Sequence, residues 1–288
     1  MTVKSLKKQL MAAIAMVLVA TIALGSSTYA WFAANAEVTA TGMQVQAAAE
    51  GGIEIAYTTS AETTGSYATS ATAGATSASA LAPTSTLDTT AWYHASASLA
   101  SASAANPATY ETLSITENAI TGQSFGKLGG VTVGTDTTNY YMVQTFNIRS
   151  TSTTSLGKGL TVDSVSVAGN SATMSQALRV AVVLGSKALI YDPVANDTTP
   201  YAVYSGYNAT ATPPAATKAG DVTITDKDTA TLLAAAATTE IPAKGTSANG
   251  GVDVKVYVWF EGEDSMLYSE NFSTEGLTVT VNFSATVQ

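Results

Sequence analysis

Segments in which apolar and polar residues alternate constrain the fold of this chain more than any other feature. In Leu277–Val287 every second residue is apolar, and the residues between them are Thr, Asn or Ser. This period of two is typical of a β-strand with one buried face. Val252–Phe260 and Tyr140–Ile148 are further predicted strands, because both are rich in β-branched and aromatic residues. The chain is therefore predicted to be all-β.

Weaker alternation continues through the rest of the chain. Residues 37–49, 53–57 and 160–167 alternate, and the slip at Thr41–Gly42 predicts a β-bulge. Leu178–Leu184 is instead almost continuously apolar, which predicts a central strand buried on both faces.

Two short helices are also expected, together with one hairpin. Asn170 or Ser171 is a candidate N-cap for a helical turn that reaches Gln176, and Asp228 for a helix that reaches Ala237. Residues 188–191 are expected to return beside Leu178–Leu184 as a hairpin.

Proline placement divides the chain into a core and two insertions. None of the seven prolines falls inside a predicted strand, as expected where a central ladder needs every N–H. The core of an antiparallel sandwich is assigned to residues 37–57, 138–191 and 252–288. Residues near 58–109, rich in Ser, Thr and Ala, and 192–220 are predicted to be long surface insertions. Five apolar side chains are candidates to attach the first insertion to the body: Leu81, Leu87, Trp92, Tyr93 and Leu99.

The N-terminus has the pattern of a secretory signal peptide. Three lysines, the last at residue 8, precede a mostly apolar run from Leu10 to Leu24. As a helix this run spans about 22 Å, which is less than the roughly 30 Å of a bilayer core. Thr28, Tyr29 and Ala30 form a cleavage sequence directly before Trp31, so residues 1–30 are predicted to be removed. Cleavage after Ala36, or a retained membrane anchor, remains an alternative.

Composition indicates an exported protein that associates with itself. The remaining residues 31–288 are predicted to form a single β-sandwich domain. Its net charge is −12, compared with −9 for the full chain, because the three lysines leave with the signal peptide. An acidic chain is a poor partner for nucleic acid. Only 11% of the residues are charged, so copies repel one another weakly. The absence of cysteine is unremarkable for export across a single bacterial membrane, and it excludes thiolate chemistry.

Residues suited to catalysis or to cofactor binding are scarce. The only histidine, His94, lies in the first insertion and is expected to be exposed to solvent, which leaves no basis for a Ser-His-Asp relay or a zinc site. No enzyme activity and no cofactor are predicted. Glu261, Glu263 and Asp264 form the one weak candidate for a calcium site, since Ca²⁺ prefers closely spaced carboxylates. A solvated loop, or carboxylates that cap backbone amides, explains the same cluster.

Several short motifs resemble the TasA/camelysin family of exported proteins from Gram-positive bacteria. They are Thr28–Phe32, the Val38-x-Ala40-x-Gly42-Met43-x-Val45 pattern, Ala177–Val182 and Trp259–Asp264. The resemblance implies a jelly-roll-like sandwich, a dedicated signal peptidase, and secretion into extracellular or cell-surface fibres of the biofilm matrix. It also implies that the N-terminus of one subunit completes a sheet of the next. Other matrix or cell-wall components are further candidate partners.

The start of the mature chain gives this implication a physical basis. Its first six residues, from Trp31 to Ala36, are uncharged and mostly apolar, which suits them to adding a strand at a sheet edge. The donor-strand candidates are Trp31, Phe32, Ala33, Ala34, Asn35, Ala36 and Val38. The alternative is that these residues form the first strand of their own molecule.

A second functional hypothesis is a membrane-anchored adhesin or carbohydrate-binding module. Its ligand contacts would be Trp92, Tyr93 and the acidic residues 261–264. A secreted hydrolase that uses His94 is the third hypothesis.

Overall fold

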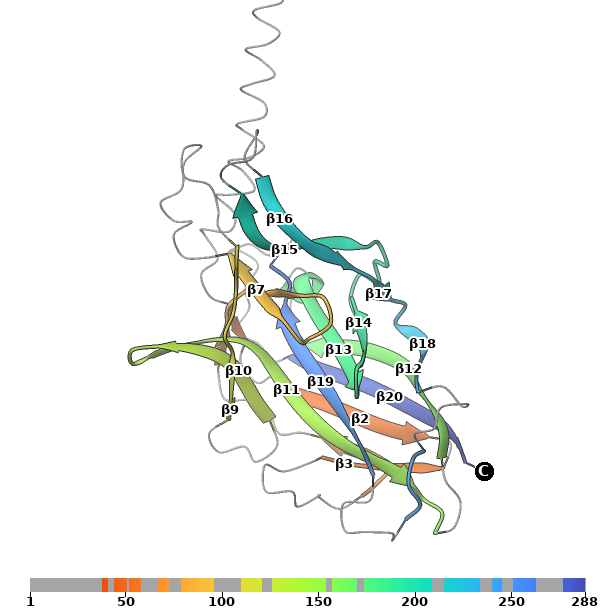
Figure 1. Ribbon diagram of the computed structural model, residues 1–288. Helices are drawn as coiled ribbons and strands as arrows, with labels where there is room; N and C mark the ends of the chain where they lie inside the picture. Colours follow the sequence, from red (N-terminus) through yellow and green to blue (C-terminus); the bar gives the residue numbers. More distant parts are fainter. Residues whose placement is uncertain are drawn as a thin grey trace, which may run out of the picture.

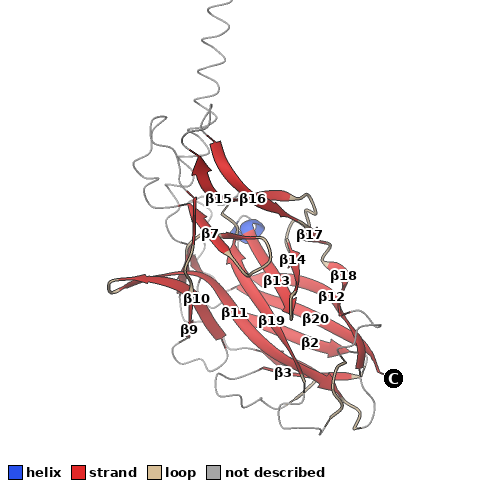
Figure 2. Cartoon of the chain, viewed as in Figure 1, coloured by secondary structure: helices blue, strands red, loops and turns tan. Residues whose placement is uncertain are grey.

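The computed structural model is built almost entirely of β-strands. It describes residues 38–40, 44–50, 52–57, 67–72, 79–95, 110–120, 126–153, 157–169, 174–208, 215–233, 240–244, 251–262 and 277–287. Within these ranges the one helical element is the 3₁₀ turn η2 (Met174–Ala177), shown in blue in Figure 2. No described helix is long and apolar enough to cross a membrane. The predicted all-β class is confirmed.

Ten strands form the main sheet, in the order β1-β5-β11-β19-β13-β14-β17, with β3 and β10 also paired to β11 and β9 paired to β10 (Figure 1). Their bounds are β1 Val38–Ala40, β3 Ile53–Tyr57, β5 Ser79–Leu81, β9 Thr116–Ala119, β10 Gly126–Val133, β11 Asp136–Ser150, β13 Leu178–Leu184, β14 Lys187–Tyr191, β17 Ile224–Thr225 and β19 Val252–Phe260.

Five strands form the second sheet, in the order β18-β12-β20-β2-β4. Their bounds are β2 Gln44–Glu50, β4 Ser70–Thr72, β12 Gly157–Gly169, β18 Asp228–Leu233 and β20 Leu277–Val287. Most pairings are antiparallel, but β2 runs parallel to β20, β17 to β14, and β5 to β11 at one position.

The remaining strands form an outer layer over the main sheet. This layer consists of a small sheet and a hairpin. The sheet comprises β6 (Ser85–Thr86), β7 (Trp92–Ala95) and β8 (Tyr110–Thr112), and the hairpin comprises β15 (Tyr201–Asn208) and β16 (Ala215–Val222).

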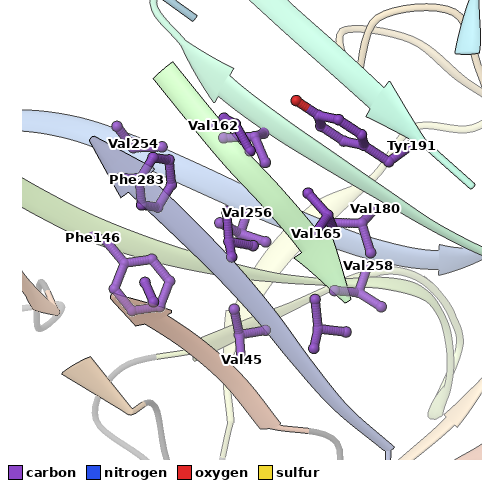
Figure 3. Close-up of a cluster of buried hydrophobic side chains, with 14 of the residues drawn as sticks. Val45, Phe146, Val162, Val165, Val180, Tyr191, Val254, Val256, Val258 and Phe283 are labelled. Carbon is purple, nitrogen blue, oxygen red and sulfur yellow. The ribbon is translucent and has the colours of Figure 1, made fainter. Parts of the chain in front are cut away.

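The inner core lies between the main sheet and the second sheet. Apolar side chains of β11, β13 and β19 face those of β2, β12 and β20, among them Phe146, Val256 and Phe283 (Figure 3). The two sheets also meet at both sides. Ile55 of β3 exchanges two backbone hydrogen bonds with Ala68, next to β4, and the carbonyl of Lys227, between β17 and β18, accepts one from Val165 of β12. The body is therefore a nearly closed roll.

A second apolar cluster, here called the outer cluster, lies between the main sheet and the outer layer. The main sheet contributes Tyr141, Ala181, Tyr257 and Trp259, and the outer layer contributes Trp92 and Val203. In β13, Val180 and Val182 face the inner core while Ala181 faces the outer cluster. This double burial explains the continuous apolar run of Leu178–Leu184 and confirms its assignment as a central strand.

Several predicted elements are confirmed, and others are corrected. β14 forms the expected hairpin with β13, and η2 overlaps the predicted helical turn from Met174 to Gln176. The helix expected from Asp228 is wrong, since Asp228–Leu233 is strand β18, paired with β12. The bulge predicted at Thr41–Gly42 lies outside the described residues, between strands that belong to different sheets.

Both predicted insertions contribute buried structure. Leu81, Ala82 and Trp92 are buried, as predicted for Leu81 and Trp92 as attachment points, and Leu87 and Tyr93 pack against the outer cluster. Strands β15 and β16 pair with each other, and Val203 and Val222 are buried. The apolar residues of these parts cover the outer face of the main sheet. Leu99 lies outside the described residues.

The alternation in β20 makes a direct prediction about stability. Phe283 is fully buried in the inner core, whereas Thr280 is on the opposite face of the same strand. We expect Phe283→Ala to lower the free energy of unfolding by about 3–5 kcal/mol, because it leaves a cavity. The matched change Thr280→Val should alter it by less than about 0.5 kcal/mol. Chemical denaturation of both variants measures the difference, and equal losses would contradict the assigned faces.

Candidate functional site

The N-terminal strand β1 lies at one end of the main sheet. It pairs only with β5 among the described strands, through Val38 with Leu81 and Ala40 with Ser79. Strand β5 is held in turn by the fully buried side chain of Leu81 and by a 2.7 Å hydrogen bond from the Ala82 N–H to the carbonyl of Asn139. Among the described strands, β1 therefore forms a short edge of the main sheet, and residues 31–37 come directly before it in the sequence.

The structure describes only part of the predicted N-terminal site. Thr28, Tyr29, Ala30 and the donor-strand candidates from Trp31 to Ala36 lie outside the described residues. Val38 is described and pairs within its own molecule, which agrees, at this residue, with the alternative of a strand that belongs to its own fold.

The carboxylate of Glu261 accepts three side-chain hydrogen bonds between the main sheet and the outer layer. The Ser85 hydroxyl donates to Oε1, and both the Tyr201 hydroxyl (2.7 Å) and the Trp259 indole N–H (3.2 Å) donate to Oε2. Glu261 is only 1% exposed, and its backbone N–H donates to the carbonyl of Ala177. The carboxylate therefore joins β6 and β15 of the outer layer to the end of β19.

Burial and hydrogen bonding act on Glu261 in opposite directions. Removal from water raises the pKa of Glu261, because the charged form loses its hydration. Hydrogen bonds from Ser85, Tyr201 and Trp259, together with the positive charge of Arg179, lower it, but the net direction is upward. The folded protein therefore binds the proton of this carboxyl group more tightly than the unfolded chain does.

Arg179 extends the polar contacts beside this carboxylate. Its Nη1 lies 3.6 Å from the Asp192 carboxylate and donates to the carbonyl of Gln176 at 2.7 Å. Both charged side chains are buried. The guanidinium carbon of Arg179 lies 5.9 Å from the centre of the Tyr201 ring. Arg179 thus joins the start of β13 to the end of β14 next to the outer layer.

These contacts change the interpretation of the calcium candidate. Glu261 lies in the interior, with both carboxylate oxygens bound by protein donors, and not in a solvated loop. Glu263 and Asp264 lie outside the described residues. Within the described ranges, no group of three or more His, Cys, Asp or Glu side chains is arranged to hold a metal ion. The hydrogen bonds from Ser85, Tyr201 and Trp259 instead tie Glu261 to the outer layer and to β19.

The side chains proposed for an adhesin are also engaged inside the protein. Trp92 is 4% exposed, stacks on Tyr141 at 4.3 Å and meets Trp259 edge-on at 5.4 Å. Tyr93 is half-buried. A carbohydrate stacks on an exposed aromatic face, which the buried ring of Trp92 does not offer, and the carboxylate of Glu261 is buried as well.

His94 is half-buried, contrary to the expectation of a solvent-exposed ring. Its Nδ1 lies 3.1 Å from the Pro83 carbonyl oxygen, and its ring meets Tyr140 at 5.2 Å. These contacts give His94 a packing role in the outer layer.

Sequence reasoning missed Ser85, Tyr201 and Asp192 as partners of the buried charged groups, although one signal was present. Alternate residues of a strand share a face, so Glu261 continues the row of Tyr257 and Trp259 on the outer face of β19. A carboxylate in line with buried aromatic residues indicates an interior position. Its hydroxyl partners come from polar segments with no comparable signal.

No family model, curated protein or solved structure matches this chain.

The buried carboxylate predicts a characteristic pH dependence of stability. Because the folded-state pKa of Glu261 is raised above its ordinary value of 4.5, the folded state binds the proton more tightly than the unfolded state does. This stabilisation is complete below pH 4.5 and is lost as the pH rises through the folded-state pKa. Glu261→Gln removes the titration, so its melting temperature relative to the wild type should be higher at about pH 7 than at about pH 4.

Glu117→Gln, at a partly exposed carboxylate on β9, serves as the control for loss of a negative charge. The melting temperatures of the wild type, Glu261→Gln and Glu117→Gln are measured by thermal unfolding across this pH range. A pH-independent difference between Glu261→Gln and the wild type would contradict the assignment.

Proposed function

We propose that the chain is an exported structural protein that assembles into extracellular or cell-surface fibres, as components of a biofilm matrix do. The observation that carries the proposal is the position of β1 at an end of the main sheet, directly after the apolar segment Trp31–Ala36. In the proposed assembly this segment of one mature molecule adds to a sheet edge of the next.

Strand addition would satisfy two physical requirements of the segment. Its backbone N–H and C=O groups need partners, and a sheet edge provides them. Its Trp and Phe side chains need an apolar environment, and burying a side chain such as Phe contributes about 1.5–3 kcal/mol. Before cleavage the same residues would follow a membrane-bound leader, so proteolysis would control when they become available.

The described body supports this proposal by what it leaves unpaired. The main and second sheets meet at both sides, so their long inner strands offer few open edges. The described strands that end a sheet are β1 and β17 of the main sheet and β18 and β4 of the second sheet, and β9 is paired only with β10. Backbone hydrogen bonds join the two sheets beside β4 and between β17 and β18, whereas no such bond to the second sheet is described for β1. A short contact along such a margin suits repeated assembly better than enclosure of a small ligand.

Deleting residues 31–37 from the mature chain tests the proposal. We expect the deletion to abolish filaments while the circular dichroism and melting temperature remain close to those of the parent, because these residues precede β1. Trp31→Ser combined with Phe32→Ser, which keeps the length but removes the apolar contacts, should also reduce assembly. Electron microscopy and sedimentation provide the readout. Filaments of normal length from the deletion variant would refute the proposal.

Cleavage after Ala30 is tested separately. The exported chain is expected to begin at Trp31, and Ala30→Leu should block this cut because signal peptidases require a small residue at that position. N-terminal sequencing of exported material identifies the site. A chain that starts at Glu37 would support the second cleavage site, and an intact leader would support the membrane anchor.

A further inference from the structure

The outer part of the β10–β11 hairpin projects from the body and is called the arm here. It comprises residues 131–138 and extends away from the two main layers (Figure 1). Val133 pairs with Asp136 across a tight turn, where Gly134 adopts a φ of 66°. Glycine at the first turn position allows this left-handed conformation without strain. The arm is thus a well-formed two-stranded ribbon.

The strands of the arm pair only with each other among the described strands. β9 pairs with β10 from Lys127 to Gly130, and not beyond Gly130. On the other side, β19 pairs with β11 only from Tyr141 onward, and β5 contacts it at Asn139. The arm therefore offers two short open edges.

Within residues 131–138 these edges lack the usual protection against pairing with another chain, and the register shift of the hairpin lies before them, between Gly129 and Gly130. Natural edge strands are blunted by lysine, proline, bulges or a covering element. Residues 131–138 contain no Lys, Arg or Pro, and their one charged residue is Asp136. Val133 is 76% exposed, and in the described part of the chain it is the one large apolar side chain that is exposed to solvent. An unprotected edge beside an exposed valine indicates a contact surface.

We propose that the arms of two copies of this chain pair edge to edge about a two-fold axis at Thr132. Hydrogen-bonded and non-hydrogen-bonded pairs alternate in an antiparallel ladder, and a two-residue hairpin closes on a hydrogen-bonded pair, here Val133–Asp136. The N–H and C=O of Thr132 therefore point away from β11. Two such edges placed antiparallel exchange two hydrogen bonds between their Thr132 residues.

The side chains of this edge complement a second copy of themselves. In the two-fold pairing, Val131 of one copy lies opposite Val133 of the other, on one face of the strand. Pairs of β-branched residues across strands are favourable, and no charged residue lies in the paired segment 131–133. Val131 already packs against the outer cluster. Val133 of the second copy would therefore be covered at the margin of that cluster.

The partner of the arm follows from the size and charge of this edge. The paired segment is short, so two isolated molecules associate weakly through it. Along a filament the same contact repeats many times, and weak contacts then act together. A neutral edge on an acidic chain also suits a copy of the chain better than a basic partner. The arm contact is separate from the proposed strand addition by residues 31–37.

A single cysteine provides the most direct test, since the native chain has none. In the proposed pairing, the Cα atoms of the two Thr132 residues lie about 5.5 Å apart, which is within disulfide range. The two Thr137 residues lie three strand spacings apart, roughly 14 Å. Mild oxidation of mature Thr132→Cys should therefore give a disulfide-linked dimer, and Thr137→Cys on the same arm should remain monomeric.

Two further changes on the Thr132→Cys background identify the edge. Val133→Lys should abolish the cross-link, because it places a charge inside the paired segment. The matched change Thr135→Lys adds the same charge at an exposed position of the turn, outside that segment, and should leave the cross-link intact. The measurement is the fraction of dimer on a non-reducing gel.

Three outcomes would overturn the arm contact. One is an equal dimer yield from Thr132→Cys and Thr137→Cys, which indicates random collision. The others are an unchanged yield after Val133→Lys and an equal loss after Thr135→Lys. The same cross-link should form in the variant that lacks residues 31–37, so a failure of fibre formation and a failure of the arm contact are distinguished.

Discussion

The rest of the structure depends on the burial of both faces of β11, β19 and β13. On one side their side chains meet β2, β12 and β20 in the inner core, and on the other they meet the outer layer through the outer cluster. Each buried Val, Leu or Phe side chain contributes about 1.5–3 kcal/mol. Because one set of strands supplies both clusters, the outer layer is part of the folded body and not an appendage.

The buried polar groups fix how that layer sits. An isolated buried carboxylate is costly, and its cost falls only when donors surround it. Glu261 receives its donors from Ser85, Tyr201 and Trp259, which come from three different strands or their ends. An apolar contact alone tolerates sliding of one layer over another, whereas these hydrogen bonds require one alignment, so the carboxylate contributes specificity more than stability. Such a site was hard to predict, because Ser85 and Glu261 lie 176 residues apart and nothing local in the sequence shows that they meet.

The sequence predicted the elements whose side-chain pattern is local. Leu277–Val287 alternates because one face of β20 meets the core, and Leu178–Leu184 does not alternate because both faces of β13 are covered. The helix predicted from Asp228 was wrong because a capping Asp followed by Leu and Ala also fits a helix, and only pairing with β12 decides for a strand. Strand β10 carried no clear signal, since two glycines interrupt its pattern. A Cβ atom at Gly129 would overlap the ring of Tyr141, so tertiary packing requires the glycine that hides the strand.

Symmetry relates the two proposed self-contacts. Strand addition by residues 31–37 joins different surfaces of two molecules, and a contact of this kind propagates into a filament unless its rotation closes a ring. Pairing of two arms joins identical surfaces, so it is complete after two molecules and cannot propagate by itself. Together they would give filaments joined side by side, with length set by the first contact and lateral association by the second. The acidic, sparsely charged surface suits this division, because the weak lateral contact has little repulsion to overcome.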